Sequence, residues 1–204
     1  MFIFGHVGLT LGIAKLLTDK IKISSSSTFW KEGKHAYASD NVEQNASGSI
    51  PLSQLIDVRI LVTGALLPDI IDKPLGVFIL KDIFGNGRIF SHSLLFLLII
   101  ALSGLVIFRC WNKIWLLTLS FGVFAHLAFD EMWLNLPTLL WPLMGLAFKK
   151  EDVSDWIMHM LEGVLENPHV YLPEIIGFII TIWFLLKIIR LKELKDLVTN
   201  GRIL

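Results

Sequence analysis

The chain has 204 residues, of which 54% are hydrophobic, 11% aromatic and only 18% charged, and its mean hydropathy is +0.66. This composition is too apolar for an ordinary soluble domain, so we expect an all-α, polytopic helical bundle that forms a single membrane domain over residues 1–204. The formal net charge is zero, which argues against a nucleic-acid partner because such a partner requires a concentrated basic face.

Five apolar runs predict about five transmembrane helices, at residues 2–17, 58–80, 92–108, 113–129 and 172–190. Several runs are close to the lower limit of roughly 17 residues for a spanning helix. Tilt and the interfacial side chains of Trp111, Trp115 and Trp183 would help them to span. The first run lacks the basic start and the cleavage pattern of a secretory signal, so we expect it to be retained.

Two segments outside these runs have a different composition. Residues 24–54 are rich in serine, asparagine and small side chains, and predict a polar flexible loop. Its glycosylation sequon, Asn45–Ser47, is discounted because the predicted topology places this loop on the cytoplasmic side. Residues 137–171 begin with a proline-interrupted apolar piece and continue with apolar residues at helical spacing, which predicts a re-entrant or interfacial segment followed by a surface helix.

The distribution of basic residues orients the predicted bundle. With the N-terminus outside, ten of the lysines and arginines counted near the span ends fall on the inner side and five on the outer side. We therefore expect an inner (plasma) membrane protein with an outside N-terminus and a cytoplasmic C-terminus. Cys110 is the only cysteine, so it cannot form an internal disulfide, and we expect it to serve in packing.

Ionisable side chains occur in or beside the apolar runs, where each costs about 2.5–3.5 kcal/mol at a helix centre. They are His6, Asp69, Asp72, Arg88, His92, His126, Asp130 and Glu131. If successive spans alternate in direction, all of these positions lie toward one membrane face, whichever face is outside. The side chains can therefore converge on one site.

The spacing of His126 and Asp130 points to metal binding. Residues four apart share one helix face, with Cβ atoms about 5–6 Å apart, so an imidazole nitrogen and a carboxylate oxygen can reach one cation. Zinc prefers such ligands. Glu131 lies about 100° further around the helix, and we expect it at the interface instead.

Arg88 precedes His92 by four residues, and two serines flank this histidine. A fixed positive charge and hydroxyl donors in this pattern would suit a phosphate group. Ordinary structural roles remain open for all of these residues. A membrane histidine can be a bundle contact, an aspartate after Pro68 can be a cap, and Arg88 can be an interface anchor.

Four motifs occur in a fixed order: an early histidine, His6; G-x-x-L-P-D-x-x-D over Gly64–Asp72; an arginine before S-H-S, at Arg88 and Ser91–Ser93; and H-x-x-x-D over His126–Asp130. Together they resemble the membrane-bound metal-dependent hydrolase family whose bacterial founder is under LexA control. The "LLWP" at Leu139–Pro142 is similar to the family's sequence after the last motif. The resemblance covers roughly residues 1–145 without the polar loop. The ligand order is also distantly similar to that of zinc-dependent phospholipase C.

This resemblance implies a metal-dependent hydrolase, phosphoesterase- or phospholipase-like, with one divalent cation, for which zinc is favoured. The expected ligands are His92, His126, Asp130 and either Asp69 or Asp72, with His6 at an adjacent position. Water activated by the metal would attack a phospholipid or another phosphoester at the membrane interface. The spare aspartate, for which Asp72 is the candidate, would be the general base, and Arg88 would stabilise charge. The phospholipases use further ligands, but His159, Glu162, His169 and Glu174 do not match their spacing.

Two other classes of function are compatible with the same residues. An ion-coupled membrane transporter would use them as a relay, although a relay needs polar groups at several depths and these cluster at one end. A non-catalytic scaffold would use the metal only to lock the helices together. A closed coordination sphere without water would favour the scaffold.

Overall fold

The computed structural model describes residues 1–20, 22–24, 49–51, 55–150 and 156–201. Most of the loop predicted over residues 24–54, including the Asn45–Ser47 sequon, lies outside the described residues. Beside it, strands β1 (Lys22–Ser24) and β2 (Ser49–Pro51) pair antiparallel, with Ile23 opposite Ile50. All other regular elements in the described ranges are helical, so the prediction of a helical bundle is confirmed apart from this short strand pair.

All five apolar runs form helices. These are α1 (Ile3–Lys20), α4 (Val58–Lys73), α5 (Leu94–Trp111), α6 (Trp115–Phe129) and α9 (Pro168–Leu191). The run predicted over residues 58–80 is not one continuous α-helix, because α4 ends at Lys73 and the π-helix η2 (Pro74–Ile79) follows. Pro74 has no backbone N–H to donate, which interrupts the α-helical hydrogen-bond ladder at this point.

Two helices in the described residues, α5 and α9, are long and apolar enough to cross a membrane, judged by length and composition. Helix α6 is also apolar but has only 15 residues. Helices α1 and α4 carry several charged side chains, among them Lys15, Asp19, Arg59 and Lys73. The structure therefore supports two membrane-spanning helices, and the predicted number of five is not confirmed.

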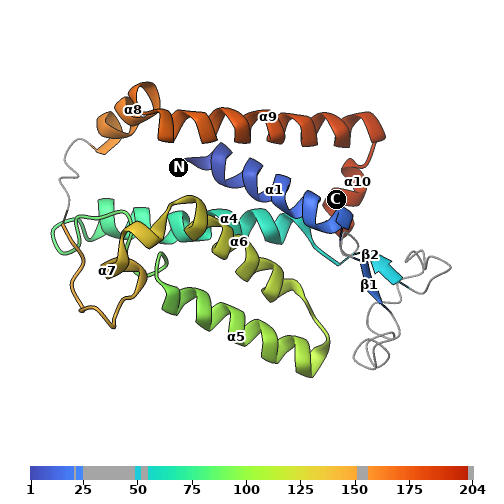
Figure 1. The fold of residues 1–204 in the computed structure, drawn as a ribbon, viewed down its shortest axis with the longest axis horizontal. Helices are drawn as coiled ribbons and strands as arrows, with labels where there is room; N and C mark the ends of the chain where they lie inside the picture. The colour runs from blue at the N-terminus through green and yellow to red at the C-terminus, as the bar shows by residue number, and fades with distance from the viewer. Residues whose placement is uncertain (21, 25–48, 52–54, 151–155, 202–204) are drawn as a thin grey trace.

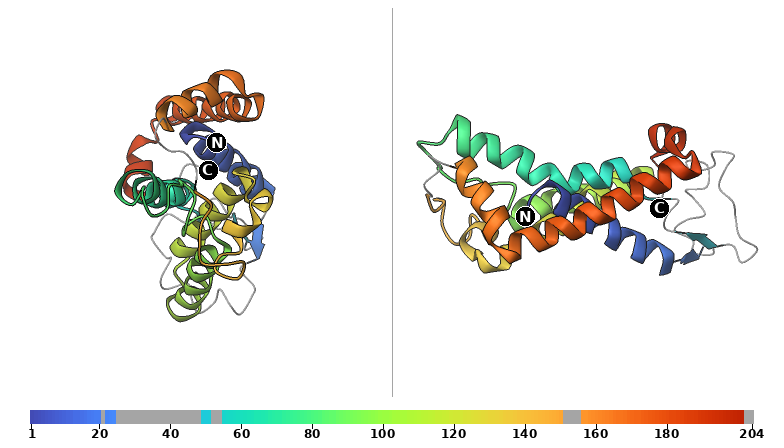
Figure 2. Two further views of the ribbon diagram at one scale, coloured as in Figure 1. Left: turned by 90° about the vertical axis from the view of Figure 1, so that its left-hand side faces the viewer. Right: turned by 90° about the horizontal axis from the view of Figure 1, so that it is seen from above.

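Successive long helices run in alternating directions. Helices α1, α5 and α9 begin, and helices α4 and α6 end, at the same end of the elongated bundle (Figure 1). Helices α9 and α5 lie on the two outer sides, with α1, α4 and α6 between them (Figure 2). The principal contacts join α4 to α6, α1 to α9, α5 to α6 and α1 to α4. The strand pair and α10 (Leu194–Asn200) lie at the opposite end.

Glycines allow the closest helix pairs to approach through their backbones. In the pair α4 and α6, a Cβ atom at Gly122 would lie 2.5 Å from the carbonyl oxygen of Leu61 and 2.7 Å from the backbone nitrogen of Ala65. In the pair α1 and α9, a Cβ at Gly8 would collide with the backbone of Gly177. Small residues at such contacts are typical of helix packing in membranes.

The segment predicted as re-entrant or interfacial, residues 137–171, is only partly regular. It follows the 3₁₀ helix η3 (Met132–Leu134), overlaps the short helix α7 (Leu136–Leu139), and includes α8 (Trp156–Glu166), which packs against α9. The predicted amphipathic helix is therefore present, and the side chains of Leu161 and Leu165 are exposed on it. Its position at the membrane surface stays a prediction.

The approach of α4 and α6 predicts a specific sensitivity to an added methyl group. Gly122→Ala is expected to lower the free energy of unfolding by about 1–3 kcal/mol, because the methyl group would overpack the backbone contact. The measurement is thermal unfolding in detergent. Gly163→Ala is the control, because a Cβ at Gly163 in α8 meets open space and alanine favours a helix by up to about 1 kcal/mol. Equal midpoints for the two variants would contradict the close packing.

Candidate metal centre

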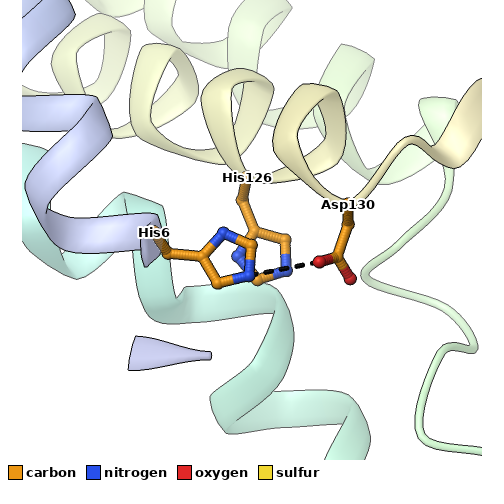
Figure 3. Close-up of side chains that lie close together, drawn as sticks. All are labelled: His6, His126 and Asp130. Atoms are coloured by element: carbon orange, nitrogen blue, oxygen red, sulfur yellow. Dashed lines mark ion pairs between the residues drawn. The ribbon is translucent and has the colours of Figure 1, made fainter. Parts of the chain in front are cut away.

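Three histidines meet at the end of the bundle where α1 begins and α6 ends. His6 comes from α1, His92 from the residues just before α5, and His126 from the last turn of α6, and all three side chains are fully buried. The rings of His6 and His126 are stacked with centroids 3.9 Å apart (Figure 3). The Nε2 atoms of His92 and His126 are 3.2 Å apart. The convergence expected from alternating helices is therefore present.

The orientation of His126 is fixed by the backbone of α4. Its Nδ1 lies 2.7 Å from the carbonyl oxygen of Ala65. A carbonyl oxygen only accepts, so Nδ1 must be the protonated nitrogen that donates. Ala65 adjoins Gly64, and a Cβ at Gly64 would collide with the backbone of α6. The close packing of α4 and α6 thus brings this carbonyl within reach of the imidazole.

Asp72 fixes the orientation of His92 in a similar way. The Oδ2 atom of Asp72 lies 2.7 Å from Nδ1 of His92. The same carboxylate accepts hydrogen bonds from the backbone N–H groups of Ile89, Ser91 and His92, at 2.8–3.2 Å, and from the hydroxyl of Ser91 at 2.5 Å. These hydrogen-bond donors together stabilise the buried negative charge of the Asp72 carboxylate. Asp72 is fully buried, and it shapes the chain that precedes α5.

These two constraints leave both Nε2 atoms with their lone pairs. In a neutral imidazole only one nitrogen carries hydrogen, and in each ring that nitrogen is Nδ1. Two lone pairs at 3.2 Å repel each other unless a proton or a cation lies between them. Tetrahedral zinc with bonds of about 2.0–2.2 Å places its ligand atoms about 3.3–3.6 Å apart, which is close to the observed separation.

Asp69 completes a first group of candidate ligands with His92 and His126. Its Oδ1 atom lies 3.6 Å from Nε2 of His92 and 3.8 Å from Nε2 of His126. The other oxygen, Oδ2, accepts a hydrogen bond of 2.5 Å from the ammonium group of Lys73, four residues along α4. Lys73 therefore holds one carboxylate oxygen of Asp69 and leaves the other facing the histidines.

Asp130 forms a second group with His6 and His126. Its Oδ1 lies 3.2 Å from Nε2 of His6 (Figure 3), without hydrogen-bond alignment. The same oxygen lies 2.8 Å from the Met1 amine. Among the described residues neither ring nitrogen of His6 has a hydrogen-bond partner, although the ring is fully buried. Asp130 Oδ2 lies 3.8 Å from Nε2 of His92, so the two groups adjoin.

The structure separates the two aspartates that the sequence left as alternatives. Asp69 belongs to the first group of candidate ligands, whereas Asp72 belongs to neither group found in the described residues. The oxygens of Asp72 are already engaged by backbone and side-chain donors. The geometry therefore favours Asp69 as the ligand and gives Asp72 the role of orienting His92.

Arg88, Ser91 and Ser93 do not together form the group of phosphate-binding donors that the sequence predicted. The Nε atom of Arg88 donates to Oδ2 of Asp130 at 2.9 Å, and 44% of the arginine side chain is exposed. Ser91 donates to Asp72, and Ser93 caps the N-terminus of α5 by accepting from the backbone N–H of Phe96 at 3.2 Å. The hydroxyl groups are therefore part of the scaffold, while Arg88 is at the edge of the centre.

Glu174 contributes to the centre from α9 in a way the sequence did not predict. It accepts hydrogen bonds from the backbone N–H groups of Phe2, at 2.5 Å, and Gly5, at 3.1 Å. An anion at a helix N-terminus satisfies unpaired donors and interacts favourably with the helix dipole. Glu174 thus holds the start of α1 next to His6. Its signal in the sequence is that it is the only charged residue between positions 170 and 186.

Of the other residues considered as extra ligands, His169 is exposed in the first turn of α9, and the side chain of His159 lies outside the described part of the structure. The roles of the Ala65 carbonyl and of Lys73 were also not predicted from the sequence. A backbone carbonyl leaves no signal in the sequence, whereas Lys73 follows Asp69 at the i,i+4 spacing of a helical ion pair.

A helical bundle with two membrane-length apolar helices and a buried histidine–aspartate centre at one end defines an integral membrane protein. The family model described as YdjM inner membrane protein matches residues 1–194, so the chain belongs to this family. The predicted inner-membrane location is confirmed, while the orientation of the termini stays a prediction. The family description names no hydrolase activity, and similarity to phospholipase C also stays a prediction. No curated protein and no solved structure matches the chain.

The contact between α9 and α1 predicts the effect of removing Glu174. Glu174→Ala is expected to cost about 0.5–2 kcal/mol of stability, the usual range for a lost helix N-cap. It should also speed hydrogen exchange of the first amides of α1. Thermal unfolding and exchange mass spectrometry check this, with Glu166→Ala, at the exposed end of α8, as the control. Unchanged exchange in α1 would contradict the capping role.

Proposed function

We propose that this protein is a membrane-embedded, metal-dependent hydrolase that cleaves a phosphoester at the membrane interface. The observation that supports the proposal most directly is the pair of facing Nε2 atoms on His92 and His126, 3.2 Å apart, with a carboxylate oxygen of Asp69 beside them. A buried pair of this kind is unfavourable without a bound proton or cation, and the donor set is the one that zinc prefers.

The same donors support one divalent cation, for which zinc is favoured. His92, His126 and Asp69 would hold it, with His6 and Asp130 adjacent. Nδ1 of His126 is committed to the Ala65 carbonyl, so only its Nε2 can bind metal. The two groups of candidate ligands share His126, and they therefore compete for a single ion.

The reaction would divide between the cation and the protein groups around it. When bound, a divalent cation supplies a Lewis acid that polarises a phosphoryl oxygen and brings the pKa of a water molecule toward neutrality. Asp72 keeps His92 in the tautomer that presents Nε2. Arg88 would place positive charge beside the phosphoryl group, because its guanidinium adjoins Asp130 at the edge of the centre.

A metal-stabilised scaffold is the second candidate, and one observation favours it. All three histidine side chains are fully buried, as in a closed structural metal site. Against this, 13% of the Asp69 side chain is exposed, and Arg88 and Asp130 line an open cavity. An ion-coupled transporter is supported less well, because the far halves of α5 and α9 offer few polar groups for a relay.

The proposal predicts which substitutions remove the metal. The protein purified without chelators is expected to contain about one zinc per chain, and His126→Ala and Asp69→Ala should lose it. Asp72→Asn should weaken zinc affinity by about 10–100-fold, because it disturbs the orientation of a ligand. Elemental analysis measures the metal, and Asp196→Ala in α10, at the opposite end of the bundle, is the control.

Hydrolysis of bis(p-nitrophenyl) phosphate by the same preparations separates the candidates. Zinc-dependent hydrolysis that disappears in His126→Ala supports the enzyme. Bound zinc without hydrolysis of this or any lipid phosphoester would indicate the scaffold. Unchanged zinc content in both His126→Ala and Asp69→Ala would contradict the metal site itself. Ion flux in proteoliposomes that depends on Asp130 would favour the transporter.

A further inference from the structure

A cavity of about 530 Å³ opens beside the candidate metal centre, between η3 and the first turns of α9. Its lining includes Arg88, Asp130, Asn135, His169, Leu134 and Leu172. The volume falls within the range of roughly 300–1,000 Å³ that is usual for small-molecule sites. Two residues of the lining connect the cavity to the metal centre. Asp130 is one of the candidate ligands, and Arg88 contacts Asp130. The cavity therefore reaches the edge of the centre.

The inner wall of the cavity favours an anion. Arg88 uses Nε to bind Asp130, and its terminal guanidinium nitrogens make no hydrogen bond or ion pair with the described residues. A guanidinium edge matches the geometry of phosphate oxygens. Asp130 and Glu131 bring two negative charges to the lining, and Arg88 and the Met1 amine match them. A cation bound in the centre would make the balance positive.

The exposed part of the cavity lining includes two leucines, beside the polar side chains of Glu131, Asn167 and His169, and it continues onto the surface of a candidate membrane span. The side chains of Leu134 and Leu172 at the mouth are 74% and 50% exposed. Beyond Leu172, the exposed side chains of Ile175, Ile176 and Ile179 follow the same helix, α9. An apolar track therefore begins at the cavity and extends along a helix that is long enough to cross the membrane.

We propose that this cavity binds the phosphorylated headgroup of a membrane lipid, with its phosphate beside Arg88 and an acyl chain along Leu172 and the exposed face of α9. This inference deepens the proposed function and rests on it for the reaction and for the cation that makes the charge of the cavity positive. A lipid suits the cavity better than a soluble phosphoester because the exposed leucines of the lining are continuous with the exposed apolar face of α9.

Binding of three probes tests this assignment. The purified protein is titrated with dihexanoyl phosphatidylglycerol, with glycerol phosphate as the headgroup alone, and with dihexanoylglycerol as the chains alone. The lipid is expected to bind at least about tenfold more tightly than either part, a difference of about 1.4 kcal/mol. If glycerol phosphate bound as tightly as the lipid, the ligand would be a soluble phosphoester and the assignment to a lipid would be overturned.

Variants then locate the bound lipid. Leu172→Trp should obstruct the mouth and weaken lipid binding about tenfold or more, with little effect on glycerol phosphate, whereas Arg88→Gln should weaken both. Leu134→Trp, on the other side of the mouth, provides a second obstruction. Leu186→Trp is the matched control because this leucine is exposed on α9 away from the cavity lining. Equal lipid affinity in Leu172→Trp, Leu134→Trp and Leu186→Trp would overturn the proposal.

The outcome of these lipid-binding experiments is distinguishable from a failure of the proposed hydrolase function. Lipid binding that depends on Arg88 and Leu172, in a protein without hydrolysis, would support the cavity and contradict the enzyme. Zinc-dependent hydrolysis that is equally fast on lipids in Leu172→Trp and the unsubstituted protein would support the enzyme and contradict the cavity. Zinc content and thermal midpoint, measured for every variant, establish that the tryptophan variants are folded.

Discussion

The candidate centre depends on the contact between two imidazole rings whose tautomers are fixed by other groups. The Ala65 carbonyl requires a proton on Nδ1 of His126, and the Asp72 carboxylate requires one on Nδ1 of His92. When both rings are neutral, the unprotonated Nε2 atoms face each other at 3.2 Å. Each orienting group is itself positioned by packing or by hydrogen bonds. The fold therefore holds two nitrogen lone pairs face to face unless a proton or a cation lies between them, and a cation held with Asp69 would replace their repulsion with attraction.

Packing far from the rings determines whether this contact can form. Glycines let the backbones of α4 and α6 meet, which brings the Ala65 carbonyl to His126. Glu174 from α9 caps α1, and the approach of Gly8 to Gly177 fixes the same pair of helices. The packing of these two helix pairs brings His6 of α1 and His126 of α6 together. The apolar surface of α5 and α9 faces outward, where membrane lipid would cover it.

The sequence predicted the helices and their convergence because apolar runs of sufficient length form helices and successive membrane spans alternate in direction. His6, His92, His126 and Asp130 were all placed correctly at one end of the bundle. The break at Pro74 and the charges of α1 and α4 explain why these two helices do not have the length and composition of a membrane span, so the predicted number of five is not confirmed. Asp69 and Asp72 could not be distinguished, because the donors that engage Asp72 are mainly backbone N–H groups. The positions of such groups depend on the fold around Ile89 and Ser91.

The central claim is that the facing histidines hold a divalent cation. Anomalous scattering at the zinc edge from crystals of the protein, grown without chelators, tests it most directly. The account predicts one peak per chain, at about 2.0–2.1 Å from the Nε2 atoms of both His92 and His126 and within bonding distance of Asp69. A protein loaded with zinc that shows no peak there, or shows it only at residues outside this cluster, would contradict the account.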